Sequence, residues 1–311
     1  MKKVLHLDSN HSVLWNGLEA LGFQNEADYS CSYEHLLGRI ENYDGLIIRS
    51  RLPIDSTLLK KASKLKFIGR IGAGLENIDI TAASEANIAV IAAPEGNRNA
   101  VAEHAIGMLL SLLNRMRIAD AEVRQGIWKR EENRGIELSQ LTVGIIGYGH
   151  MGKQFAKRLS GFDCQVICCD ILPQLGDQFA KQVPLETIFE EADVISLHTS
   201  QNATTIHLIN EAFIAQMRKP FWLINTARGS AVDTEALLSG LKSQKVKGAA
   251  LDVLEFENKA FTAFLEEDLN HQTLQGLFKQ PNVLFSPHIA GWTHDSHYLL
   301  AKTVLEKIKS L

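Results

Sequence analysis

Short apolar runs alternate with segments of helical periodicity from one end of the chain to the other. Repeated strand, helix, strand units predict parallel sheets covered by helices, which is the α/β class. In the first third we expect a helix over residues 12–21, stopped by Gly22. The strands expected there lie at residues 4–7, 45–49, 66–69 and 89–92.

A second set of such units begins near Leu141. Its short apolar runs lie at residues 143–146, 165–169, 194–197, 222–225, 248–251 and 283–285. Six buried strands in succession fit one doubly wound sheet. Residues 293–311 have helical periodicity but are too few for a domain, so we expect them to pack on a domain formed earlier.

The length of 311 residues favours two domains, because a single hydrophobic core rarely grows so large. The turn-rich loop at residues 93–97 marks a boundary. We predict two doubly wound parallel-sheet domains with a cleft between them, one formed by residues 97–287 and inserted in the other, formed by 1–96 and 288–311. The helix expected from residue 99 to 113 is apolar nearly all round, so it must be covered by another domain or subunit.

Charge and composition narrow the class of partner. A formal net charge of -4 gives no attraction to nucleic acid or anionic lipid, and no run approaches the roughly 18 apolar residues that cross a bilayer. The first residues are too few and too polar for a signal peptide. The four cysteines show no metal-ligand spacing, so we expect no metal. A soluble cytoplasmic protein with reduced thiols and a small-molecule partner is predicted.

A glycine-rich turn supplies the first sign of function. The segment GYGHMG at residues 147–152 directly follows a predicted strand and precedes a predicted helix. Gly147 permits a tight turn, Gly149 lets a pyrophosphate approach the backbone, and Gly152 allows the helix to pack closely on the strand. Asp170 lies eighteen residues after Gly152, at the end of the next strand. Its carboxylate can there accept hydrogen bonds from the ribose hydroxyls, and it would repel a 2'-phosphate. This pattern predicts a Rossmann domain that binds NAD rather than NADP.

Three further strand ends carry polar side chains, at INTARG (residues 224–229), ALDVLEFE (250–257) and FSPHIAG (285–291). Together with GYGHMG, these motifs resemble the D-isomer-specific 2-hydroxyacid dehydrogenase family, and the resemblance covers nearly the whole chain. The segments RSR (49–51) and FIGRIGAG (67–74) are most similar to those of D-3-phosphoglycerate dehydrogenases. The resemblance implies a flavodoxin-like substrate domain that contains the inserted Rossmann domain.

Reduction of a 2-keto acid requires a cation, a proton donor and a partner for that donor. Arg228 can bind the substrate carboxylate and polarise the carbonyl group, and His288 can supply the proton. A neighbouring carboxylate would favour the charged imidazole. The resemblance assigns this role to Glu257. Glu255 stays an alternative, because Asn258 stands where the family has proline and the stretch 259–280 is longer than usual.

The resemblance also implies a set of cofactor contacts. These come from Gly147, Gly149, His150, Met151, Gly152, Asp170, Thr199, Thr226, Ala227, Arg228, Asp252, His288 and Gly291. Within this set, His150 and Met151 offer backbone to the pyrophosphate, and Asp252 faces the carboxamide. The family's histidine-x-proline appears here as His198-Thr199-Ser200, so the turn over the adenine differs, and we interpret His198 as structural.

The same resemblance implies which residues bind the substrate. Ala73 and Gly74 offer backbone to its carboxylate. Arg49, Ser50 and Arg51 bind a phosphate group, helped by Arg130, which reaches across from a partner subunit. Arg49 and Arg51 alternate along a strand, so both can bind one phosphate only if the turn that follows reorients one of them.

The sequence therefore predicts an NAD-dependent dehydrogenase of small D-2-hydroxy acids, most similar to enzymes that oxidise 3-phosphoglycerate in serine biosynthesis. A reductase of glyoxylate, hydroxypyruvate or another 2-keto acid is an alternative. An NAD-sensing binding protein, similar to corepressors of this family, is a more distant one. We expect a homodimer formed through residues 101–113. We also expect no C-terminal regulatory domain, and so no feedback inhibition by serine, since the chain stops where the family core ends.

Overall fold

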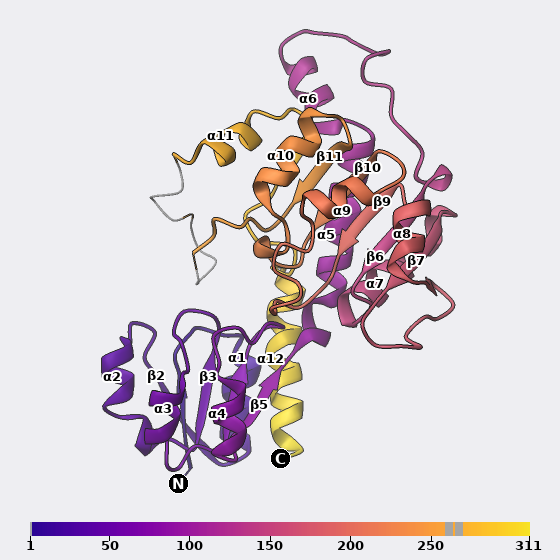
Figure 1. Cartoon of the computed structure of the whole chain (residues 1–311). Coiled ribbons are helices and arrows are strands. Elements are labelled where there is room, and N and C mark those ends of the chain that lie inside the picture. Colours follow the sequence, from indigo (N-terminus) through magenta and orange to yellow (C-terminus); the bar gives the residue numbers. More distant parts are fainter. Residues whose placement is uncertain (1, 259–263, 265–269) are drawn as a thin grey trace. The chain divides into compact units, whose positions relative to one another are not determined.

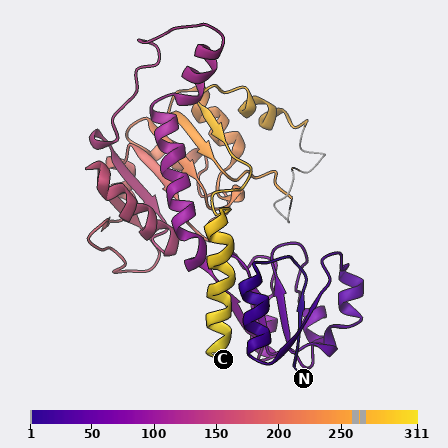
Figure 2. The same cartoon turned by 180° about the vertical axis from the view of Figure 1, so that it is seen from behind.

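The computed structural model describes residues 2–258, 264 and 270–311, in which the chain forms two compact units (Figures 1 and 2). The first unit holds the described chain up to Arg98 together with Trp292–Leu311, and the second runs from Asn99 to Asn258 and on to Gly291. The predicted boundaries, after residues 96 and 287, lie a few residues before these. Part of the long stretch noted at 259–280 lies outside the described residues.

The first unit contains a five-stranded parallel sheet in the order β2-β1-β3-β4-β5, which is the flavodoxin-like order. Its strands are β1 (Lys2–His6), β2 (Phe23–Ala27), β3 (Gly45–Ile48), β4 (Phe67–Arg70) and β5 (Ala89–Ala92). Its helices are α1 (Ser12–Ala20), α2 (Tyr33–Leu37), η1 (Ile40–Asn42), α3 (Ser56–Lys61), α4 (Ile80–Glu85) and α12 (His294–Lys309).

Helices cover both faces of this sheet. On one face, Leu14 of α1 and Val304 of α12 pack with Ile47 of β3. On the other face, α2, α3 and α4 pack against alternate residues of the same strands. The C-terminal helix α12 begins at a capping box formed by Thr293 and Ser296. The prediction that the last segment packs on a domain formed earlier is confirmed.

The second unit contains a seven-stranded parallel sheet in the order β12-β11-β10-β9-β6-β7-β8, which is the Rossmann order extended by one strand. Its strands are β6 (Thr142–Ile146), β7 (Gln165–Cys169), β8 (Lys181–Gln182), β9 (Val194–Leu197), β10 (Phe221–Asn225), β11 (Val246–Leu251) and β12 (Val283–Phe285). Its helical segments are α5 (Pro94–Leu113, which starts in the first unit), α6 (Met116–Arg124), η2 (Leu138–Gln140), α7 (His150–Leu159), η3 (Ser160–Phe162), α8 (Leu185–Glu191), α9 (Glu211–Gln216), η4 (Gly229–Ala231), α10 (Thr234–Lys242) and α11 (Gln272–Phe278).

The core of the second unit also has two layers. Residues of α5 and α7 pack on one face of the sheet, and residues of α8, α9, α10 and α11 pack on the other. The predicted fold class, two doubly wound parallel sheets, is therefore confirmed. None of the described helices is both long enough and apolar enough to cross a membrane.

Three details differ from the sequence prediction. Strand β2 was not expected, because its sequence FQNEA is mostly polar, as suits a partly exposed edge strand. Strand β8 was not expected either, since two residues carry no periodicity. The loop expected at residues 93–97 is wrong: α5 starts at Pro94, whose fixed φ and missing N–H suit the first position of a helix.

Candidate active site

The register of the second sheet aligns the carboxyl ends of its strands. Phe285 pairs with Leu251, Leu251 with Asn225, Asn225 with Leu197, Leu197 with Ile146, and Ile146 with Cys169. The residues that follow this row are Ser286, Asp252, Thr226, His198, Gly147 and Asp170. All the predicted motifs of this unit therefore meet at one sheet edge, where ligands bind in open α/β sheets.

The glycine-rich turn has the geometry that a dinucleotide requires. Gly147 has a φ of 90°, and a Cβ there would lie 2.8 Å from the carbonyl of His198. A Cβ on Gly152 would lie 2.2 Å from the Gly147 carbonyl oxygen, so only glycine allows α7 to approach the strand so closely. Gly149, in contrast, faces open space, because a Cβ there would meet nothing within 4 Å. Together these positions form a cradle at the exposed start of α7, where His150 is the first residue.

Asp170 is fixed against this turn. One carboxylate oxygen accepts the N–H of Tyr148 (2.6 Å), and the other accepts the N–H of Leu172 (2.9 Å). The Tyr148 side chain is buried beneath the turn and donates to Asp177 (2.8 Å). Burial and the contact with Asp177 raise the pKa of Tyr148 far above its usual value, so the phenol stays neutral. The carboxylate predicted to accept the ribose hydroxyls is thus held in one orientation.

Buried polar atoms next to the cradle lack partners. Among the described residues, the hydroxyls of Thr199 and Thr226 and the Nδ1 atom of His198 accept or donate no hydrogen bond. His198 Nε2 lies 2.9 Å from Ser196 Oγ, and desolvation of the half-buried ring lowers the pKa of the imidazole to about 3, so the ring is neutral at physiological pH. A buried polar group without a hydrogen-bond partner lowers the stability of the folded protein. These atoms, with the cradle at Gly149, fit a bound dinucleotide that supplies the missing bonds.

His288 and Glu257 lie together in the second unit. His288 Nδ1 is 2.7 Å from Glu257 Oε2, and the other oxygen of Glu257 accepts the N–H of Leu254. His288 has a φ of 55°, a left-handed conformation that is strained for a non-glycine residue and persists only where the surroundings enforce it. The backbone N–H of His288 donates to the carbonyl of Asp252 (2.8 Å), which holds this conformation.

Asp252 organises the loop that carries His288. Its buried carboxylate accepts hydrogen bonds from Ser286 Oγ (2.5 Å), Ile289 N (2.9 Å) and Ala290 N (2.9 Å). His104 Nε2 lies 2.9 Å from the Ser286 hydroxyl and supports it. The carboxylate is therefore largely satisfied by the protein, and its predicted contact with the nicotinamide carboxamide stays a prediction. Its supporters Ser286 and His104 were not anticipated from the sequence.

Arg228 follows β10 in a turn that Asn225 stabilises. The Asn225 side chain is fully buried, donates to the Arg228 carbonyl (3.0 Å) and accepts the N–H of Ala227 (3.0 Å). Arg228 Nη1 donates to the Ala227 carbonyl (2.6 Å). Sequence analysis assigned no role to Asn225, although it lies inside the INTARG motif.

The alternative carboxylate, Glu255, is engaged elsewhere. Its oxygens lie 2.5 Å from His207 Nε2 and 2.8 Å from the Thr234 hydroxyl, which donates to it. Glu255 and Glu257 thus take different partners, and the one beside His288 is Glu257. The geometry therefore favours Glu257 over Glu255 as the partner of the imidazole.

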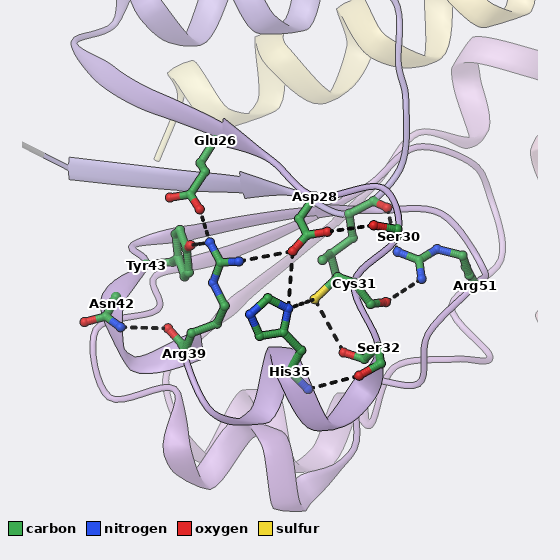
Figure 3. Close-up of polar contacts among 11 residues, drawn as sticks. Glu26, Asp28, Ser30, Cys31, Ser32, His35, Arg39, Asn42, Tyr43 and Arg51 are labelled. Carbon is green, nitrogen blue, oxygen red and sulfur yellow. Dashed lines mark hydrogen bonds and ion pairs between the residues drawn. The ribbon is translucent and has the colours of Figure 1, made fainter.

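In the first unit, the predicted phosphate-binding residues follow β3. Arg51 reaches across the sheet edge: Nη1 donates to the Cys31 carbonyl (2.7 Å) and Nη2 to the Leu7 carbonyl (2.8 Å) (Figure 3). Asp8 accepts both Arg51 Nε (3.4 Å) and the backbone N–H of Arg49 (2.7 Å). The guanidinium of Arg49 lies over the ring of Trp292, 4.6 Å from its centroid. Much of Arg51's hydrogen-bonding capacity is thus used by the protein.

The remaining predicted residues lie at the surface of their units. Ala73 and Gly74 are half-buried in the bend after β4, and Ser50 is half-buried beside the two arginines. Met151 follows His150 in the first turn of α7, and Gly291 ends the second unit. Arg130 is exposed in the segment after α6, and its predicted reach toward a partner subunit stays a prediction.

Comparisons with known proteins agree with this geometry. A sequence model of the NAD binding domain of D-isomer specific 2-hydroxyacid dehydrogenases matches residues 106–290. The chain is 34% identical over 299 residues to D-3-phosphoglycerate dehydrogenase of Archaeoglobus fulgidus, an alignment that covers 95% of this chain and 54% of that protein. It is 32% identical over 289 residues to hydroxypyruvate reductase of Thermotoga maritima, with 91% of each covered.

Solved structures extend the likeness to the whole chain. D-2-hydroxyisocaproate dehydrogenase superposes with a TM-score of 0.84 at 30% identity, covering 100% of this chain and 96% of that one. The chain spans about half the length of the D-3-phosphoglycerate dehydrogenases that it matches (54% for the Archaeoglobus protein). The names of these relatives refer to three different substrates.

Proposed function

Because this chain belongs to the D-isomer specific 2-hydroxyacid dehydrogenase family, we propose that it transfers a hydride between NAD and the C2 carbon of a small D-2-hydroxy or 2-keto acid. The observation that carries the proposal is the pair of His288 Nδ1 and Glu257 Oε2, 2.7 Å apart, in the unit that also holds the dinucleotide cradle. An imidazole held by a carboxylate is a suitable group to move a proton in step with hydride transfer.

Each residue then has a defined role. The bound nicotinamide supplies or accepts the hydride. Arg228 binds the substrate carboxylate through its planar fork and polarises the C2 oxygen. During reduction, the His288 ring nitrogen opposite Glu257 donates a proton to that oxygen. During oxidation, the same nitrogen accepts the proton from the substrate hydroxyl. Glu257 orients the ring and balances its positive charge.

We further propose that the substrate carries a phosphate, as 3-phosphoglycerate does, and that the reaction belongs to serine biosynthesis. Support comes from Arg49, Ser50 and Arg51 at one strand end, and from the likeness to D-3-phosphoglycerate dehydrogenases. Because Arg51 donates to two backbone carbonyls, we assign the direct phosphate contact to Arg49 and the support of the turn to Arg51. Arg130 remains a second phosphate ligand in this proposal.

A reductase of hydroxypyruvate or glyoxylate is the second candidate. The same engagement of Arg51 favours it, since fewer donors remain for a phosphate. The full-length alignment with a hydroxypyruvate reductase agrees with it.

A substrate panel tests the function. We expect NADH to be oxidised with 2-keto acids, at a higher kcat/KM for 3-phosphohydroxypyruvate than for hydroxypyruvate, and His288→Asn to lower kcat by about 100-fold or more. Arg49→Gln should lower kcat/KM about 10- to 100-fold for the phosphorylated substrate only, the loss of one or two charge-assisted hydrogen bonds. Preference for hydroxypyruvate in the wild type would refute the phosphate assignment. No turnover of any 2-keto acid would refute the dehydrogenase.

We also propose a homodimer in the cytoplasm, in which the interface predicted at residues 101–113 extends to the segment that follows them. Figure 1 shows α6 and the segment after it extending from the rest of the second unit. Large apolar side chains are exposed along this part of the chain, at Met116, Val123, Ile127, Trp128 and Ile136. Such a concentration of apolar surface marks an interface. Light scattering should give twice the mass of 34.5 kDa, and a monomer at micromolar concentration would contradict the proposal.

A further inference from the structure

We propose that the turn between β2 and α2 is a binding site for a thiophilic divalent cation, with Asp28, Cys31 and His35 as its ligands (Figure 3). One ligand atom from each residue lies within 4.8 Å of the others. The site belongs to the first unit and does not depend on the proposed dehydrogenase activity.

The backbone of the turn brings the ligands together. Asp28 directly follows β2, and its N–H donates to the His6 carbonyl (3.0 Å) as the sheet ends. Ser32 caps α2 by accepting the N–H of His35 (3.2 Å), so His35 lies in the first turn of that helix, one turn beyond Cys31. Figure 3 shows the thiol of Cys31 and the imidazole of His35 both directed toward the Asp28 carboxylate.

The distances are close to those of a tetrahedral zinc site. Cys31 Sγ lies 3.9 Å from His35 Nδ1, which lies 3.5 Å from Asp28 Oδ2. Zinc bond lengths of about 2.0–2.3 Å place neighbouring ligand atoms about 3.3–3.6 Å apart at tetrahedral angles. Cys31 Sγ and the Asp28 carboxylate lie within 4.8 Å of each other, so binding an ion requires this third pair to approach by up to about 1.2 Å, while the other two pairs shift by a few tenths of an ångström.

The ligand types select the class of metal. Magnesium and calcium take oxygen ligands, whereas a thiolate, an imidazole and a carboxylate together suit zinc and similar ions. Three protein ligands leave a fourth position for water. Cys31 is 2% exposed but the His35 side chain is 60% exposed, so an ion can enter from the His35 side.

The guanidinium of Arg39 opposes binding. Arg39 Nη1 lies 3.1 Å from Asp28 Oδ2, the oxygen that also faces His35. Arg39 also contacts Glu26 and the Tyr43 hydroxyl, and these contacts can persist when Nη1 leaves Asp28. The remaining repulsion between guanidinium and ion lowers the affinity. We therefore expect a weaker site than a structural zinc site with four ligands.

A bound ion would restrain the backbone of Cys31, whose carbonyl accepts a hydrogen bond from Arg51 at the edge of the sheet. Cys31 O accepts Arg51 Nη1 (2.7 Å), and Arg51 also holds the Leu7 carbonyl (2.8 Å). Occupancy would therefore stabilise the first unit, and mass action predicts that zinc raises its melting temperature.

Zinc binding to the full chain tests the site directly. Protein without an affinity tag, freed of metal and kept reduced by a phosphine, is titrated with zinc in competition with a coloured chelator. We expect one equivalent in the wild type, loss of that equivalent in Cys31→Ser and His35→Gln, and retention in His35→Cys, which restores a ligand. Matched controls are Cys164→Ser and His294→Gln, which should bind as the wild type does because both residues lie outside the cluster.

Two further measurements identify the ligands and guard against unfolding. Cobalt in place of zinc should give a sulfur-to-cobalt charge-transfer band, absent in Cys31→Ser. Zinc should raise the melting temperature of the wild type but not of Cys31→Ser, whose circular dichroism without metal should equal that of the wild type. Binding that survives in both ligand variants, or a cobalt spectrum without the sulfur band, would show that the ion sits elsewhere and overturn the proposal.

Discussion

The two sheets of this chain end in carboxyl edges of opposite character. At the edge of the second sheet, Gly149 leaves open space and the hydroxyls of Thr199 and Thr226 lack partners among the described residues. At the edge of the first sheet, Arg51 donates to two backbone carbonyls and Asp8 accepts from two arginines. One edge is incomplete without a ligand, whereas much of the polar surface of the other is satisfied by the protein itself.

This difference explains which functions the sequence could reveal. A site that must leave room for a ligand constrains residue type, so glycines appear at fixed spacing. A site whose polar groups form hydrogen bonds with one another does not require particular residues at a fixed spacing in the sequence, because many combinations of side chains can donate to a backbone carbonyl. Residue spacing therefore identifies the second edge, whereas the arginines of the first edge were identified by resemblance, and their contacts with Asp8 and the backbone carbonyls only by the structure.

The largest effect that would test this contrast is expected from Gly149→Val. A Cβ at this position would meet no atom within 4 Å apart from those of its chain neighbours, so the larger side chain should fill the open space of the cradle, and we expect the fold to be unchanged. Blocking even one or two backbone N–H bonds to a pyrophosphate, each worth about 1.5–3 kcal/mol, should raise the Kd for NADH about 100-fold. Fluorescence titration of NADH measures this.

The matched control for that variant is Gly161→Ala, also without a neighbour within 4 Å but away from the sheet edge. Its affinity for NADH should equal that of the wild type. If Gly149→Val binds NADH as tightly as this control, the open space is not the cofactor cradle and the contrast between the two edges fails.

Much of the fold followed from hydrophobic pattern alone. Both parallel sheets and most strands were predicted because central strands such as β9 (VISL) are buried on both faces and leave apolar runs. The edge strands β2 and β8 were not predicted, since β2 is mostly polar and β8 has only two residues. Pattern identifies the strands that fill a core and misses those that only border it.

The candidate site was predictable in part. The motifs located Arg228, His288 and the glycine turn, but spacing left Glu255 and Glu257 as alternatives. The local backbone separates them, because a turn in which Leu254 donates to Glu257 directs that carboxylate to His288. Supporting residues such as Asn225 and Asp8 were not found, since a side chain that accepts a backbone N–H does not need to stand at a fixed distance from it in the sequence.

The smallest effect is expected from substitutions that remove polar groups from the two edges in the absence of cofactor. Arg51→Met leaves the Leu7 and Cys31 carbonyls without their donor, and because the arginine is 33% exposed, water compensates in part. A loss of about 1 kcal/mol in the free energy of unfolding, or roughly 2–4 °C in Tm, is expected.

Thr226→Val removes a hydroxyl that has no partner among the described residues, so Tm should stay the same or rise slightly. Calorimetry of the two cofactor-free variants measures both melting temperatures. If Thr226→Val lowers Tm as much as Arg51→Met does, the polar groups of the second edge are satisfied by the protein to the same degree as those of the first, and the contrast fails.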